Sequence, residues 1–417
     1  MDPERKAAVA RGLDFLSAFF AHDERLFALG AQCVSTFYDI YLSETDTELC
    51  ERARGEALQL LARLERHWLT AWPPAESWTR DHFLEVVTLA RYAPAGFDPQ
   101  PLLALAQVAA ASSIDLRNLT LEQFGDLPFM GTADWYDTMH AAFRFEYCVH
   151  ACPDCRFAAS PRVGMRECFS ALRRLSLEAP CQCSPHSEFG ECYYLATHAT
   201  YWLSAFGATQ RVTACPWLYA YVRRVLEFWM RQADLRDAGT PGEDAADGLV
   251  YVDLDGVAEC VDVLRGVESA ERDAVCGAAA SGAGDDDGDD AGLAQRQQVR
   301  AVMDGLPALL ARASGWLLKW QREDGSWPPT RHARDPLRTK QFAHASDVAA
   351  DALYNAMHPT WTATMALCDR PTARHDSERQ RPGLAFSQRM RELMRETRFE
   401  RQETAKRRTK RAQHQQR

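Results

Sequence analysis

The chain has 417 residues, of which 46% are apolar and 10% aromatic, so wholesale disorder is excluded. Its 48 Lys and Arg residues stand against 58 Asp and Glu residues, and this net charge of −10 argues against nucleic-acid binding by the body of the protein. No apolar run approaches the ~18–20 residues that a membrane span needs, and the opening residues are charged and amphipathic. We therefore expect no membrane span, no signal peptide, a cytoplasmic location and mostly reduced cysteines.

Long amphipathic helices are predicted over residues 48–72, 165–177, 217–232 and 299–320. In the first, apolar residues recur at spacings of three and four, and Asp46 and Thr47 are candidate N-caps. Shorter, less charged segments alternate with these at residues 83–92, 136–147, 199–207, 257–264 and 360–367. This alternation predicts an all-α protein in which outer helices face water and inner helices are wrapped on all sides.

Composition divides the chain into four parts. Residues 1–235 and 301–370 are steadily apolar and periodic, whereas residues 236–300 are rich in Gly, Ala and Asp and read as a disordered acidic insertion. Residues 371–417 form a basic tail, helical or disordered. The insertion is either an acidic interaction loop or a tolerated insertion. The tail is either a solvated extension or a patch for nuclear import or nucleic-acid binding, which would make the protein nuclear.

The most specific string is residues 312–327, which resembles the QW motif of triterpene cyclases. The matching positions are Arg312, Ala313, Trp316, Leu317, Gln321, Gly325 and Trp327. In this motif Gln321 is expected to hydrogen-bond the backbone of the following turn, Gly325 to allow the reversal, and Trp327 to fold back on the helix. The motif braces an outer helix against its neighbour and does no chemistry.

The resemblance implies the α/α toroid shared by terpene cyclases and protein prenyltransferase β-subunits, here with about five or six helical hairpins. Residues 354–367 look like the inner helix that pairs with a QW turn, starting at Pro359. The family's functional motifs are incomplete. The acid motif D-x-D-D is reduced to Asp253-Leu254-Asp255-Gly256, and the prenyltransferase zinc motif D-x-C has Asp255 where the Cys would stand.

Polar residues recur near the starts of the predicted inner segments. His198, Asp253, Asp255 and His358 would project from one end of a toroid, and two His with carboxylates suit zinc or iron with an open position. We therefore take Asp255, His198 and His358 as candidate catalytic residues. The alternative is that these side chains are satisfied by helix caps and by one another.

A cysteine-rich stretch offers a second candidate metal site. Cys152 and Cys155 form a C-x-x-C pair, and Cys181 and Cys183 could complete a tetrahedral structural zinc site. Reduced structural thiols and a redox-active pair are the alternatives.

Two functions remain open from the sequence. The first is a metal-dependent enzyme that acts on an apolar, isoprenoid-like substrate in a central cavity, as the resemblance implies. The second is a non-catalytic toroid used as a binding or scaffold module, with zinc in the cysteine loop.

Overall fold

The computed structural model describes residues 2–120, 132–172, 188–204, 215–240, 250–266, 290–328 and 348–369, and all regular secondary structure in these ranges is helical. The prediction of an all-α protein is confirmed for these ranges. Most of the acidic run, Cys181, Cys183 and the basic tail lie outside them. No described helix is long and apolar enough to cross a membrane.

The helices in chain order are α1 (Pro3–Phe20), α2 (Asp23–Leu29), α3 (Gln32–Ser43), α4 (Thr47–Ala71), α5 (Arg80–Thr88), α6 (Gln100–Ser112), α7 (Thr132–Ala151), α8 (Met165–Leu172), α9 (Glu188–Leu203), α10 (Pro216–Asp237), a helix over residues 254–266, α12 (Asp290–Met303), α13 (Leu306–Trp320) and α14 (Val348–Leu367). Short 3₁₀ turns occur at η1 (Ala75–Ser77), η2 (Leu89–Ala95) and η3 (Leu116–Asn118).

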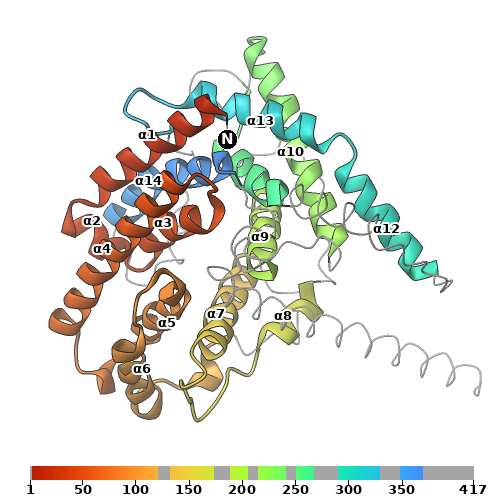
Figure 1. Ribbon diagram of the computed structural model, residues 1–417. Coiled ribbons are helices and arrows are strands. Elements are labelled where there is room, and N and C mark those ends of the chain that lie inside the picture. Colours follow the sequence, from red (N-terminus) through yellow and green to blue (C-terminus); the bar gives the residue numbers. More distant parts are fainter. Residues whose placement is uncertain are drawn as a thin grey trace, which may run out of the picture.

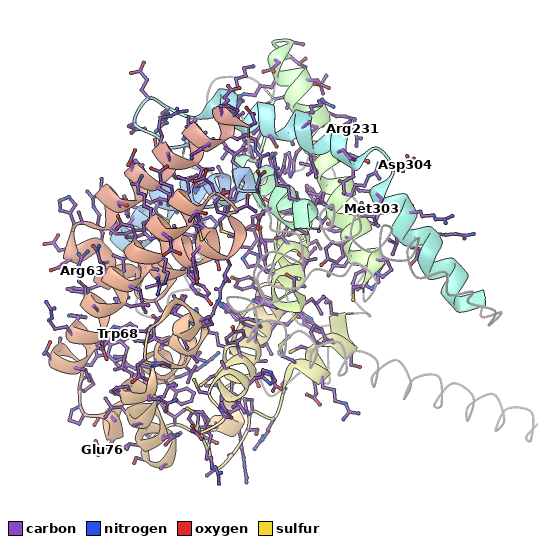
Figure 2. The ribbon with its side chains drawn as sticks, viewed as in Figure 1. Arg63, Trp68, Glu76, Arg231, Met303 and Asp304 are labelled. Atoms are coloured by element: carbon purple, nitrogen blue, oxygen red, sulfur yellow. The ribbon has the colours of Figure 1, made fainter. Side chains whose placement is uncertain are left out.

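Helix α4 forms where the sequence predicts it. The Asp46 side chain accepts a hydrogen bond from the Leu49 N–H at 3.3 Å and caps the helix. The apolar residues spaced by three and four are buried along one face. On the same helix, Arg63 (labelled in Figure 2) donates to the Phe20 carbonyl at 2.8 Å. This bond links α4 to the C-terminal end of α1. The local pattern therefore sets both the ends and the buried face of this helix.

The predicted single helix over residues 299–320 is wrong, because the structure has two helices there. Helix α12 ends at Met303 (Figure 2). Gly305 adopts a left-handed conformation with φ of 67°. A residue in this conformation ends an α-helix, and Pro307 in the first turn of α13 favours a new start, since it has no N–H to leave unsatisfied.

Helix α14 also differs from its prediction. It begins at Val348 and continues through Pro359, instead of starting at that proline. A proline inside a helix removes one backbone hydrogen bond. We attribute the continuity to packing, because residues 357–367 are all buried and α14 packs on α1, α2, α3 and α13. His358 therefore lies inside a helix.

Neighbours in the chain pack as neighbours in space. Helices α3 and α4 pack together, α7 contacts both α5 and α9, and α10 contacts α9, α12 and α13. The first helix, α1, lies along α14, the last described one, so the two ends meet (Figure 1). Their approach is close, since a Cβ on Gly12 would stand 2.2 Å from Thr364 Oγ1. This closure brings α14 into the interior beside the 254–266 helix.

The QW-type turn behaves as its residues predict. Gln321 Nε2 donates to the Gly325 carbonyl at 3.1 Å and to the Ala8 carbonyl of α1 at 2.9 Å. Trp327 folds back, is 1% exposed and donates its indole N–H to the Leu317 carbonyl at 2.8 Å. Gly325 has a φ of 87°, and a Cβ there would stand 2.2 Å from a carbonyl oxygen of α1. The turn therefore ties α13 to α1.

Candidate metal centre

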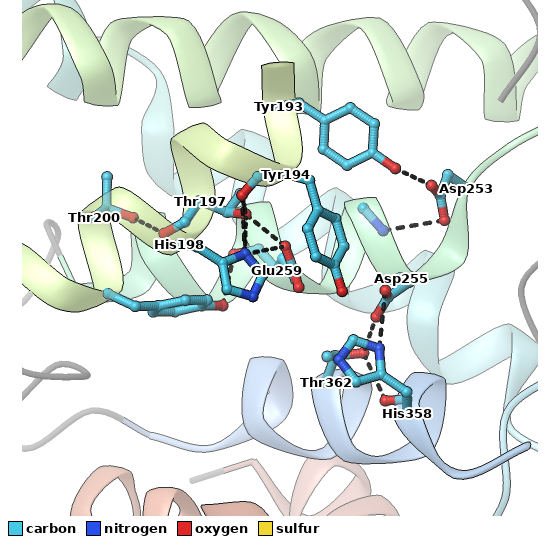
Figure 3. Close-up of polar contacts among 12 residues, drawn as sticks. Tyr193, Tyr194, Thr197, His198, Thr200, Asp253, Asp255, Glu259, His358 and Thr362 are labelled. Carbon is cyan, nitrogen blue, oxygen red and sulfur yellow. Dashed lines mark hydrogen bonds and ion pairs between the residues drawn. The ribbon is translucent and has the colours of Figure 1, made fainter. Parts of the chain in front are cut away.

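Three buried side chains converge where the 254–266 helix meets α14. Asp255 lies at the start of that helix, Glu259 one turn later, and His358 on α14. One ligand atom from each lies within 4.8 Å of the others (Figure 3). His358 Nδ1 is 3.0 Å from Asp255 Oδ2. Among the described residues, only these three form such a group, and they could hold a metal ion.

Hydroxyl groups from two neighbouring helices orient both carboxylates. Thr362, one turn after His358 on α14, donates to Asp255 Oδ1 at 2.6 Å. Thr197 on α9 donates to Glu259 Oε2 at 2.5 Å (Figure 3). Such donors fix the direction in which a carboxylate presents its remaining lone pairs, and they commonly surround metal ligands.

His198 lies beside this group without belonging to it. Its Nδ1 is 3.8 Å from Glu259 Oε2 and 2.9 Å from the Tyr194 carbonyl oxygen. The nearer carbonyl can only accept, so Nδ1 carries the proton and Nε2 is the basic nitrogen. The Tyr194 ring stacks on the imidazole at 4.5 Å, which fixes its orientation. The predicted candidate His198 is therefore a neighbour of the centre.

Asp253 is predicted as a ligand, but the structure places it in another role. Its Oδ1 accepts the Gly256 N–H at 3.2 Å, as an N-cap does, and its Oδ2 accepts the Tyr193 hydroxyl (Figure 3). Asp253 is absent from the converging group. This residue fits the alternative reading of the sequence, in which inner polar residues are satisfied by caps and by one another.

The charge of this region is unbalanced. Asp255 and Glu259 are at most 3% exposed, and their only basic neighbours among the described residues are His358 and His198. Burial raises the pKa of Glu259 well above its ordinary value, and the negative charge of Asp255 raises it further. Two buried carboxylates whose basic neighbours are imidazoles, with no Lys or Arg, can take up a proton or a cation. The site is therefore suited to a bound cation.

The donor set fits a divalent cation. Carboxylate oxygen and imidazole nitrogen together suit Mn, Fe or Zn, and three protein ligands leave positions for water or substrate. Adjacent ligands at metal distances of about 2.1 Å stand about 3 Å apart in octahedral geometry. The observed separation of His358 Nδ1 and Asp255 Oδ2, 3.0 Å, is that of a direct hydrogen bond or ion pair, and it also equals the length of one such edge.

Glu259 is not among the residues predicted from the sequence as ligands. Its spacing of four residues from Asp255 could have identified it, because residues i and i+4 lie on the same face of a helix. Glu259 falls within the stretch from Val257 to Leu264, which is otherwise apolar apart from Asp262, and Asp255 lies two residues before this stretch. Carboxylates at this spacing on a fully wrapped helix would have indicated a shared buried site.

Of the predicted cysteine site, the structure describes Cys152 and Cys155, and the thiol of Cys148 lies beside them. Cys152 and Cys155 form a tight turn after α7, with the Cys155 N–H donating to the Cys152 carbonyl at 2.8 Å. Cys148, in the last turn of α7, donates its thiol to Cys155 and lowers the pKa of that thiol to about 7. These three residues do not form a group with all ligand atoms within 4.8 Å.

Comparisons of this chain with protein-family models, with curated proteins and with solved structures found no match.

Proposed function

We propose that this chain is an α/α toroid that holds one divalent metal ion at Asp255, Glu259 and His358 and uses it in catalysis. The toroid is supported by three features. Helices adjacent in the chain pack as neighbours, α1 closes against α14, and the turn after α13 has the hydrogen bonds expected of a QW-type motif.

The metal proposal rests on the convergence of three buried ligand atoms, one each from Asp255, Glu259 and His358. A divalent cation would offset the two carboxylate charges, which no Lys or Arg neutralises among the described residues. Bound there, it would supply Lewis acidity or an activated water. His198, stacked on Tyr194 and 3.8 Å from Glu259, is placed to exchange a proton with a group bound beside the metal.

The substrate is proposed to be isoprenoid-like or otherwise apolar. This rests on the resemblance to terpene cyclases, and the aromatic side chains around the centre support it. Tyr136 and Trp202 lie within 6.0 Å of the His198 ring, and Trp361 lies 5.3 Å from His358. Such side chains exclude water and present π-faces to positive charge.

The test is the metal content of purified protein, measured by elemental analysis after exposure to Mg²⁺, Mn²⁺, Fe²⁺ or Zn²⁺ and removal of excess. We expect one equivalent in the wild type, less than one tenth of it in Glu259→Gln and in His358→Ala, and full occupancy in the matched surface control Glu51→Gln. A metal-dependent rise in melting temperature, seen in the wild type and the control alone, would confirm that the ion binds the folded state. Absence of metal and of any rise in the wild type would refute the proposal.

The second candidate is a non-catalytic toroid module with zinc in the cysteine loop. It is favoured by the incomplete acid motif and by the three neighbouring thiols of Cys148, Cys152 and Cys155. In the same experiment this candidate predicts zinc that is lost in Cys152→Ser/Cys155→Ser and retained in Glu259→Gln.

A further inference from the structure

A second polar site lies one layer of side chains away from the metal centre. It is a pocket of about 170 Å³ between the end of α2, the start of α3, the end of α4, α5 and α7. Trp68 of α4, Trp72 directly after α4 and Tyr136 of α7 line its walls (Figure 2 shows Trp68). The Trp68 and Trp72 rings stack at 4.8 Å. The pocket is thus walled by aromatic side chains.

Carboxylates outnumber cations in this pocket. Asp81, Glu85 and Asp137 line it, together with a single guanidinium, that of Arg144. Arg144 Nε donates to His140 Nε2 at 3.0 Å, so this imidazole is an acceptor and is neutral. Burial and the nearby guanidinium both lower the pKa of His140, which agrees with the neutral form.

The carboxylate of Glu85 is held in place by a backbone N–H group. Glu85 Oε2 accepts the Ala31 N–H at 2.7 Å. Gly30, with a φ of 60°, lets the chain turn against this carboxylate, because a Cβ there would stand 2.6 Å from Oε2. No hydrogen bond or ion pair to Glu85 Oε1 is present among the described residues. Glu85 therefore has one oxygen held in place and one oxygen for a ligand.

The arrangement selects the size and charge of the ligand. The acidic and imidazole groups of the pocket do not bring three ligand atoms within 4.8 Å of one another, so they are too far apart for one bare metal ion. An anion would meet three carboxylates. Aromatic walls with carboxylates suit a cation that carries alkyl groups, which the rings can desolvate and attract.

We propose that this pocket binds an organic ammonium ion with a short apolar chain, oriented by Glu85 and enclosed by Trp72 and Tyr136. Two sets of contacts connect this pocket to the metal centre, so binding in the pocket would affect the centre. The Tyr136 ring lies 4.8 Å from the His198 ring. Gln32 of the pocket donates to the Tyr354 hydroxyl at 3.4 Å, and the Tyr354 ring lies 4.4 Å from His358. The binding itself does not depend on the proposed metal function.

The experiment is isothermal titration calorimetry of the full chain with three probes of similar size: n-butyltrimethylammonium, the neutral 1-hexanol and the anion hexanoate. We expect the ammonium to bind at least about tenfold more tightly than either of the other probes. Glu85→Gln keeps an oxygen for the Ala31 N–H and should weaken ammonium binding about tenfold, as should Trp72→Leu. The surface variant Glu51→Gln should bind as the wild type does.

The same titration on Glu259→Gln separates this proposal from the metal centre. Retention of ammonium binding in that variant would support the pocket whatever the metal analysis shows. Equal binding of all three probes, tighter binding of hexanoate, or an unchanged affinity in Glu85→Gln would overturn the proposal. Hexanoate preference would identify Arg144 as the recognising group.

Discussion

Asp39 and Glu259 are both carboxylates with at most 1% exposure, but they differ in what lies beside them. Asp39 on α3 forms a buried ion pair with Arg91 of η2. Glu259 has a threonine hydroxyl, a histidine 3.8 Å away and the like charge of Asp255. In the first site, the guanidinium of Arg91 neutralises the carboxylate of Asp39. The second site has no permanently charged cation among the described residues.

The difference shows how a structural buried charge can be told from a functional one. A buried ion pair is self-contained, and removal of one partner leaves an uncompensated charge. A pair of buried carboxylates with imidazole neighbours responds to its surroundings, because protons and metal ions compete for it. We therefore expect the first site to govern stability under all conditions and the second to govern how stability depends on pH and metal.

The largest effect is expected at the ion pair. Arg91→Met leaves Asp39 buried without its guanidinium and should lower the free energy of unfolding by about 3–5 kcal/mol, measured by urea denaturation. Adding Asp39→Asn to this variant should recover much of the loss, since the unpaired charge is removed. The control Arg52→Met breaks an exposed pair with Asp14 and should cost less than about 1 kcal/mol. A loss in Arg91→Met no greater than in this control would contradict the comparison.

A pH dependence is expected at the second site. The pKa of Glu259 is raised above 4.5 in the folded state, so the folded protein binds more protons than the unfolded one above that pH. With a chelator present, the contribution of Glu259 to stability should therefore fall as pH rises from 4.5, by at most about 1.4 kcal/mol per pH unit. Glu259→Gln should lack this decline.

The measurement is the free energy of unfolding between pH 5 and 8 for the wild type, Glu259→Gln and the control Glu51→Gln, with and without saturating metal. Metal requires the ionised carboxylate and should flatten or reverse the decline in the wild type and the control alone. If the free energy of unfolding varied with pH in the same way for all three proteins in chelator, Glu259 would not be the source of the pH dependence.

The smallest effect is expected from the groups that orient the carboxylates. Thr362→Val removes the hydroxyl that donates to Asp255 and should weaken metal affinity about tenfold while costing about 1 kcal/mol of stability. The matched control is Thr364→Val on the same helix, whose hydroxyl donates to the Thr360 carbonyl instead. Competition with a metal-sensitive dye measures both affinities, and equal values would show that Thr362 has no orienting role.

Predictions that depended on local chemistry were the successful ones. The cap at Asp46 and the bonds of Gln321 and Trp327 follow from residues a few positions apart, whose geometry is set by the helix itself. The structure differs from the predictions at two helix boundaries and at residues 254–266, which form a buried helix inside the segment predicted as a disordered insertion. Gly305 splits a continuous apolar pattern, and Pro359 lies inside a helix that tertiary packing keeps intact.

The sequence by itself determined that the described parts of the chain are helical, because hydrophobic periodicity and caps act over single turns. It also marked Asp255 and His358, 103 residues apart, as polar side chains in apolar segments. Only the tertiary structure decided that these two meet Glu259, that Asp253 caps a helix, and that His198 lies next to the group. Those outcomes depend on how α9, α14 and the 254–266 helix pack, and packing between distant segments is set by the shapes of whole faces rather than by local spacing.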